Sequence, residues 1–222
     1  RTGALPCFGI GWYQRALPIS KADKGKRIFV EFDGAMSRSK VYINGQYVGE
    51  CPYGYSSFAF DITKFLKFDK ENTLLVRLEN KTESSRWYPG AGIYRNVRLV
   101  KTAKTRIAQW GTYITTKEIT NKSATIDLEV TIDNDSKSEA TVQIATSIFE
   151  MNGEGKKLGK AVAHFSSLKA KVVSGGSSKI ASSIKLKNPK LWGPQPTQTP
   201  NLYIAVTTVS QKGKPIDTYE TR

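Results

Sequence analysis

The sequence predicts an all-β protein made of two consecutive β-sandwiches. Short runs in which apolar and polar residues alternate follow one another along all 222 residues, and such alternation is typical of half-buried strands. No segment keeps the 3.6-residue period of an amphipathic helix. Asn44-Gly45 lies between two alternating runs. This is the strongest short hairpin signal, because both central positions of a type I′ turn need a positive φ.

The first half of the chain carries the clearest strand signals. We expect strands over 26–32, on both sides of Asn44-Gly45, and over 58–62, 73–78 and 93–100, with one helical turn within 61–66. In a sandwich of two antiparallel sheets, alternate residues of each strand face inward. The candidate core residues of this half are Phe29, Phe32, Val41, Ile43, Phe58, Phe60, Leu75 and Val97.

A polar stretch without periodicity at 101–105 marks the predicted boundary between two domains, 1–101 and 102–222. Beyond it we expect strands over 109–115, 124–133, 140–151, 160–165, 178–186 and 203–210. About seven short strands in about 110 residues are typical of an immunoglobulin-like sandwich. The cysteine pair of antibody domains is absent, so Trp110 or Trp192 is the candidate to fill this core.

The formal net charge of +15 is spread evenly, with +8 over 1–101 and +7 over 102–222. A nucleic-acid interface would concentrate basic residues on one element. Here lysines occur mostly singly, with the densest cluster at 156–160, so we expect no nucleic-acid partner. No apolar run reaches the about 18 residues of a transmembrane helix, and no apolar stretch follows Arg1 as in a signal peptide. We therefore expect a soluble chain with no membrane partner.

Cysteine and histidine are too few for a metal site. Cys7 and Cys51 define one disulfide, and two free thiols are the alternative. Zinc usually takes four ligands, which two cysteines and the lone His164 do not supply. His164 lies in a strand-like run, where we expect a hydrogen-bonded structural histidine. The sequence therefore predicts no metal and no cofactor.

The most informative segment is 85–97, SRWYPGAGIYRNV. Pro89-Gly90 indicates a turn, and Gly92 allows a close backbone approach or a positive φ. The segment resembles the signature that closes the sugar-binding domain of family 2 glycoside hydrolases, the group of β-galactosidases, β-glucuronidases and β-mannosidases. Further segments resemble motifs of this family in the family's order, namely 11–15 (GWYQR), 41–49 (VYINGQYVG), 52–58 (PYGYSSF), 61–63 (DIT), 188–192 (NPKLW) and 200–203 (PNLY).

The resemblance implies a jelly-roll, galactose-binding-like β-sandwich followed by an immunoglobulin-like β-sandwich. It also implies that both catalytic glutamates lie on a (β/α)₈ barrel that follows the second sandwich, and that terminal β-glycosides bind there. We therefore expect no catalytic residue in this chain. The expected parent is a retaining exo-glycosidase, with β-galactosidase favoured by the form of the 52–57 loop. The alternatives are a β-glucuronidase or β-mannosidase, or a stand-alone carbohydrate-binding module, which Tyr53, Tyr55, Trp87 and Tyr88 suggest.

Two groups of non-catalytic site residues follow from the same resemblance. The candidates for the rim of the substrate pocket are Phe8, Arg86, Trp87 and Tyr88. For Arg86 the alternative is an ion pair with Glu83, and for Trp87 it is packing. The candidates for a contact with the barrel are Pro89, Gly92, Tyr94 and Arg95.

The resemblance also bears on context. The chain lacks the opening strands that such a sugar-binding domain has, so we expect a shortened or processed form of a longer protein. Exported relatives favour a periplasmic or secreted location, and a homo-oligomer is compatible with the sequence.

Overall fold

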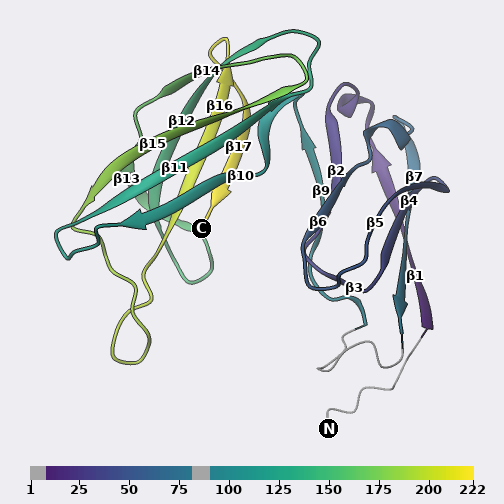
Figure 1. The fold of residues 1–222 in the computed structure, drawn as a ribbon, viewed down its shortest axis with the longest axis horizontal. Helices are drawn as coiled ribbons and strands as arrows, with labels where there is room; N and C mark the ends of the chain where they lie inside the picture. The colour runs from purple at the N-terminus through teal and green to yellow at the C-terminus, as the bar shows by residue number, and fades with distance from the viewer. Residues whose placement is uncertain (1–8, 82–90) are drawn as a thin grey trace. The chain divides into compact units, whose positions relative to one another are not determined.

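A computed structural model describes residues 9–81 and 91–222 of the protein. The chain forms two compact units, Arg1–Lys101 and Thr102–Arg222, and each is built from facing layers of strands (Figure 1). The described helices are single 3₁₀ turns, η1 (Lys21–Asp23) and η2 (Thr63–Phe65). None of the helices in the described parts of the chain is long and apolar enough to cross a membrane. The all-β class is confirmed.

The first unit contains a four-stranded sheet, a three-stranded sheet and a short two-stranded ribbon. The four-stranded sheet has the order β1 (Gly9–Ile19), β7 (Lys70–Asn80), β4 (Ser39–Ile43), β5 (Gln46–Cys51). The three-stranded sheet has the order β6 (Phe58–Asp61), β2 (Arg27–Phe32), β9 (Val97–Thr102), and the ribbon pairs β3 (Ala35–Met36) with β8 (Gly92–Ile93). Together they form the predicted sandwich.

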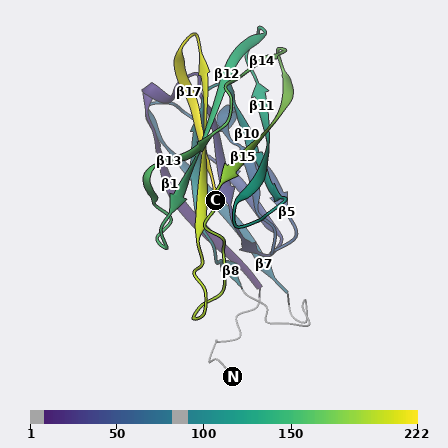
Figure 2. The ribbon, with the colours of Figure 1, turned by 90° about the vertical axis from the view of Figure 1, so that its left-hand side faces the viewer.

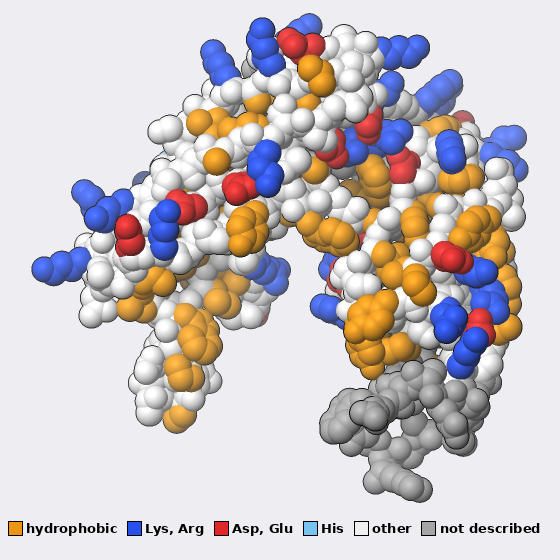
Figure 3. Space-filling model, viewed as in Figure 1, with side chains coloured by type: hydrophobic (Ala, Val, Ile, Leu, Met, Phe, Trp, Pro, Cys, Tyr) orange, Lys and Arg blue, Asp and Glu red, His pale blue; other side chains and the backbone are white. Residues whose placement is uncertain are grey.

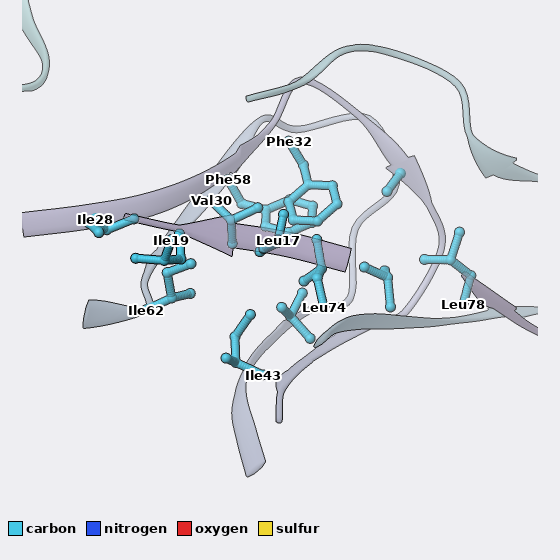
Figure 4. Close-up of a cluster of buried hydrophobic side chains, with 13 residues drawn as sticks. Leu17, Ile19, Ile28, Val30, Phe32, Ile43, Phe58, Ile62, Leu74 and Leu78 are labelled. Carbon is cyan, nitrogen blue, oxygen red and sulfur yellow. The ribbon is translucent and has the colours of Figure 1, made fainter. Parts of the chain in front are cut away.

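The core of this unit lies between the two larger sheets. Figure 4 shows side chains from both sheets meeting there, with the rings of Phe32 and Phe58 stacked at 4.8 Å. Ile28, Val30 and Phe32 alternate along β2 and are almost fully buried. Burying a large apolar side chain contributes about 1.5–3 kcal/mol, so this strand is a principal source of the unit's stability.

Four of the eight predicted core residues are buried, namely Phe32, Val41, Ile43 and Phe58. Phe60 is partly buried and packs against the same cluster. The prediction is wrong for Val97, which is 41% exposed. It is also wrong for Phe29 and Leu75, which are half-buried. For Phe29 and Leu75 the physical reason is strand phase, because their neighbours Ile28, Leu74 and Val76 take the inward positions. Val97 is the first residue of β9, and Leu99, two residues further on, is the one that packs against the core.

The predicted hairpin and the predicted helical turn are both present. Asn44 and Gly45 connect β4 to β5, with φ of 52° and 79°, and η2 lies within the predicted 61–66. The side-chain amide of the fully buried Asn72 links the hairpin to the segment that follows η2. Its Oδ1 accepts from Asn44 Nδ2 at 2.8 Å and from the Lys67 amide at 2.7 Å. The hairpin is therefore fixed by side-chain hydrogen bonds as well as by its turn.

The second unit is a sandwich of a three-stranded and a five-stranded sheet. The first has the order β10 (Thr105–Lys117), β11 (Ser123–Asn134), β15 (Gly176–Lys187). The second has the order β13 (Lys157–His164), β12 (Ala140–Met151), β16 (Leu202–Gln211), β17 (Lys214–Thr221), with β14 (Leu168–Val172) also paired to β12. The β16–β17 hairpin is drawn in yellow in Figure 2. The six predicted strands are present, whereas β14 and β17 were not predicted.

The core of the second unit is aliphatic. It contains Leu128, Ile132 and Ile144 at 2% exposure or less, together with the buried ring of Phe165. Trp110 and Trp192 are 56% and 60% exposed, so the prediction that one of them fills the core is wrong. Trp110 lies where the β10–β11 register shifts between Ile107 and Thr112, and its φ of +50° belongs to this irregularity. A β-bulge re-aims side chains out of the regular alternation.

Candidate functional site

The described end of the signature segment forms an edge of the first unit. Strand β8 pairs with β3 through Ala35↔Ile93 and Met36↔Gly92. The amide of Asp33 donates to the Asn96 carbonyl at 2.9 Å, which extends this connection beyond the ribbon. We call this region, residues 33–36 and 91–96, the β3–β8 edge.

Gly92 has both properties that the sequence suggested. Its φ is +104°, in the region that glycine adopts at little cost. A Cβ on Gly92 would stand 2.6 Å from the Tyr13 hydroxyl oxygen. The backbone of β8 therefore passes against the Tyr13 side chain, and any larger residue would have to displace the Tyr13 hydroxyl.

Tyr94 ties the β3–β8 edge to the loop at 52–57. Its hydroxyl donates to the Gly54 carbonyl at 2.9 Å. Its ring lies over Gly34. A Cβ on Gly34 would be 2.6 Å from Cζ of Tyr94 and 3.0 Å from Cδ of Arg95. Tyr94 nevertheless remains 47% exposed, and Arg95 is exposed as well. The hydrogen bond positions Tyr94 while leaving much of its surface open.

The loop at 52–57 presents an aromatic pair. Tyr53 and Tyr55 are 62% and 52% exposed, and their rings meet edge to face at 5.6 Å. Gly54 lies between them against the Met36 side chain. Cys51, just before the loop, is a free thiol whose Sγ lies 3.5 Å from the Tyr53 carbonyl oxygen.

A cleft of about 290 Å³ adjoins the β3–β8 edge. Its lining is mostly apolar, with Tyr13 and Asn80 as polar members. The lining residues are Gly9, Ile10, Gly11, Tyr13, Met36, Leu78, Asn80, Ala91 and Gly92. Apolar clefts with a few polar groups are typical ligand sites, so this cleft is the site candidate of the first unit. Sequence reasoning identified Gly92 but missed Met36 and Asn80, which enter through strand pairing.

Several predicted residues lie outside the described residues. They are Cys7, Phe8, Arg86, Trp87, Tyr88 and Pro89. Of the predicted site residues, Gly92, Tyr94 and Arg95 are described, and the β3–β8 edge brings them together.

Glu31 and Asp33 form a carboxyl pair whose surroundings shift the two pKa values in opposite directions. Burial raises the pKa of Glu31, whereas the Arg98 guanidinium, 2.6 Å from Oδ1, lowers the pKa of Asp33. Opposite shifts are the pattern of an acid and a base. Neither residue lines the cleft above, and the Asp33 carboxylate is already bonded to the Arg98 guanidinium. We interpret this pair as structural.

The second unit has an apolar cleft of about 390 Å³. The exposed side chains of Ile119, Leu191, Trp192 and Leu202 contribute to it. The sequence singled out 188–192 as a motif but did not predict a cleft. Exposed hydrophobic side chains lie on the drawn face of both units, among scattered lysines and arginines (Figure 3).

The lone histidine, His164, lies on strand β13. His164 Nδ1 lies 2.9 Å from the Ser147 hydroxyl, so the predicted hydrogen bond of this histidine is present. Within 9–81 and 91–222, no group of three or more His, Cys, Asp or Glu side chains could hold a metal ion.

Family comparisons cover both halves of the chain. The family model described as "Glycosyl hydrolases family 2, sugar binding domain" matches residues 6–103. The model described as "Glycosyl hydrolases family 2" matches residues 105–222.

Individual relatives agree with the family matches. A β-galactosidase of Bacteroides ovatus is 39% identical over 220 residues, 99% of this chain and 25% of its own length. A putative β-glucuronidase of Formosa agariphila is 36% identical over 216 residues, 94% of this chain and 18% of its own length. The solved structure of a putative β-galactosidase of Bacteroides fragilis has a TM-score of 0.83 at 32% identity, covering 97% of this chain and 32% of that one. The chain thus spans a third or less of each of these relatives.

Proposed function

Because the chain belongs to glycosyl hydrolase family 2, we propose that it is the non-catalytic N-terminal region of a retaining exo-glycosidase that removes terminal β-galactosyl residues. The observation that carries the proposal is the 39% identity to a β-galactosidase over 99% of the chain. That relative is about four times as long as the matched region, because the match spans 25% of its length. The remaining length is the proposed place of the catalytic carboxyl groups.

The chemistry of the described carboxyl groups supports a non-catalytic role. A retaining glycosidase needs two carboxyl groups about 5–5.5 Å apart, one of them a protonated acid. In the described part of the chain, a raised carboxyl pKa occurs at Glu31 and Asp217, which belong to different units. Asp217 accepts hydrogen bonds from the Ile107 and Thr218 amides. Its oxygens are therefore engaged by backbone rather than directed at a substrate.

Three other functions remain as alternatives. A β-glucuronidase is favoured by the 36% identity to a putative β-glucuronidase, and a β-mannosidase of the same family is the third glycosidase. A stand-alone carbohydrate-binding module is favoured by the exposed rings of Tyr53 and Tyr55.

We further propose two roles for the signature region. Phe8, Arg86, Trp87 and Tyr88 form part of the substrate rim. Pro89, Gly92, Tyr94 and Arg95 hold the first unit against the catalytic domain. The hydrogen bond from Tyr94 to Gly54 supports the second role, because an element fixed before assembly loses less conformational freedom on contact.

The test compares the full-length protein with the 222-residue chain. Both are assayed with nitrophenyl β-galactoside, β-glucuronide and β-mannoside. We expect the full-length protein to have its highest kcat/KM on the galactoside, and the 222-residue chain to be inactive on all three. A higher kcat/KM on the glucuronide or mannoside overturns the substrate assignment. Turnover by the repurified chain, in proportion to its concentration, overturns the non-catalytic role.

A further inference from the structure

The outer face of the four-stranded sheet carries a row of aromatic side chains. Trp12 of β1, Tyr42 of β4 and Tyr47 of β5 lie opposite the core. Leu17 and Val41 are buried in the alternate phase of β1 and β4, and Tyr47 pairs with Tyr42 in the strand register. The rings of Trp12 and Tyr42 are 5.8 Å apart, and those of Tyr42 and Tyr47 are 5.5 Å apart. We call these three residues the aromatic row.

The aromatic row is open to solvent. Trp12 is 57% exposed and Tyr47 is 50% exposed, and Tyr42 between them is half-buried. The water-facing side of an antiparallel sheet ordinarily carries polar side chains. Three linked aromatic rings across such a face therefore indicate a binding surface.

The size of the row favours a small ligand over a protein partner. An aromatic side chain buries about 150–250 Å² when covered. Three rings that are about half exposed thus offer on the order of 300 Å², whereas a stable protein interface buries about 800 Å² per partner. The row alone is too small to hold a second copy of the chain.

Charged side chains beside the row are paired with one another. Arg77, opposite Trp12 in the strand register, contacts Glu79 Oε2 at 3.3 Å. Lys40 lies 3.6 Å from Glu50 on the neighbouring strands. These pairs present donors and acceptors for hydroxyl groups, and Lys81 lies 3.6 Å from Oε1 of the same Glu79 carboxylate. Each of these cations already has a carboxylate partner, with which an anionic ligand would have to compete. The surface therefore favours a neutral ligand over an anionic one.

Ring faces combined with paired polar side chains match the chemistry of sugars. A pyranose has an apolar face that can stack on an aromatic ring, and its hydroxyls can bond an arginine fork. The planes of the row are inclined by 39° and 62° to one another. A flat crystalline polysaccharide could not contact all three rings, whereas a single twisted glycan chain could.

We propose that the aromatic row is a binding site for a neutral, soluble glycan chain. Trp12 and Tyr47 supply the stacking surfaces, and Arg77 with Glu79 bonds the hydroxyls. This site goes beyond the proposed glycosidase assignment and does not require it, because it uses only residues of this chain.

The test is affinity electrophoresis of the 222-residue chain in gels containing β-1,4-galactan, β-1,4-mannan or polygalacturonate, followed by titration calorimetry. We expect at least one of the two neutral polymers to retard the chain. Trp12→Ala and Tyr47→Ala should each weaken binding about tenfold, which corresponds to about 1.4 kcal/mol. Tyr47→Phe keeps the ring and should keep most of the affinity.

Matched controls come from the second unit. Trp110→Ala and Tyr113→Ala remove aromatic side chains that are 56% and 64% exposed, and we expect unchanged binding. Melting curves of all variants verify folding. Three results overturn the proposal: no retardation by either neutral polymer, equal loss in the control variants, or binding to polygalacturonate alone that disappears at moderate salt. A concentration-dependent dimer abolished by Trp12→Ala would instead assign the face to self-association.

Discussion

Asp217 shows how one buried carboxyl group sets a pH dependence. Its Oδ2 accepts from the Ile107 amide at 2.8 Å, yet burial raises its pKa above the ordinary 3.8. A carboxyl group whose pKa is raised on folding stabilises the fold most when protonated. This contribution is lost as the pH rises through the folded-state pKa.

We therefore expect Asp217→Asn to melt at the same temperature as the wild type or a few degrees higher at pH 7. Asparagine keeps one acceptor oxygen for Ile107 and carries no charge, and the acceptor that it gives up faces the Thr218 amide in an exposed position, where water can replace it. At pH 3 the two proteins should melt together, because Asp217 is then protonated. Melting temperatures at both pH values test this. A lower melting temperature for the variant at pH 7 would show that the charge itself is needed.

At the scale of elements, Asn72 joins the β4–β5 hairpin to the turn before β7. The side chain is fully buried, and it bonds Asn44, the Lys67 amide and carbonyl, and the Lys70 carbonyl. Removing it leaves buried polar groups unsatisfied, at about 1–3 kcal/mol for each group. We expect Asn72→Ala to lower the free energy of unfolding by about 3 kcal/mol or more in urea titrations.

The matched control is Asn152→Ala. Asn152 Oδ1 also accepts two backbone amides, but in an exposed turn, where water can replace the lost bonds. We expect Asn152→Ala to lower the free energy of unfolding by only about 1 kcal/mol. Equal costs at the two positions would mean that burial does not decide the contribution of these amides.

The β3–β8 edge depends on a glycine. Gly92→Ala adds a Cβ at a φ of +104° and places it 2.6 Å from the Tyr13 hydroxyl. We expect a lower melting temperature, with partial recovery when Tyr13→Phe removes the hydroxyl. Gly11 lines the same cleft, and a Cβ there meets no atom within 4 Å. Gly11→Ala is therefore the control, and equal melting temperatures for both glycine variants would contradict the steric argument.

Local sequence patterns predicted which segments form strands and turns better than they predicted which residues of a strand face the core. Asn44-Gly45 specifies its own turn, so the hairpin could be predicted. The run Leu74-Leu75-Val76 is apolar in either phase, and only pairing with β1 and β4 decides which residues face inward. Likewise, Met36 reaches the cleft through its pairing with Gly92. A contact between residues so far apart in the sequence leaves no local pattern.

For the whole molecule, the central feature is the presence of two separate hydrophobic clusters, one in each unit. A domain of about 120 residues buries enough surface to fold alone. We expect residues 102–222, expressed alone, to unfold in one cooperative transition. Circular dichroism and calorimetry of this fragment test the expectation. A fragment that lacks a cooperative transition would show that the second unit depends on the first.

The hydrogen bonds around Asn44 also bear on the chemical ageing of the protein. Asn-Gly sequences deamidate readily, because the glycine amide nitrogen can attack the asparagine side chain to form a succinimide. Asn44 Oδ1 accepts from the Thr73 amide, and its Nδ2 donates to Phe65 and Asn72, which prevents the rotation that attack requires. Asn152-Gly153 has the same sequence, and its Oδ1 also accepts two backbone amides, but in an exposed turn where water can replace these bonds. On prolonged incubation of the folded protein, mass spectrometry should find deamidation at Asn152 first, and at Asn44 only after unfolding.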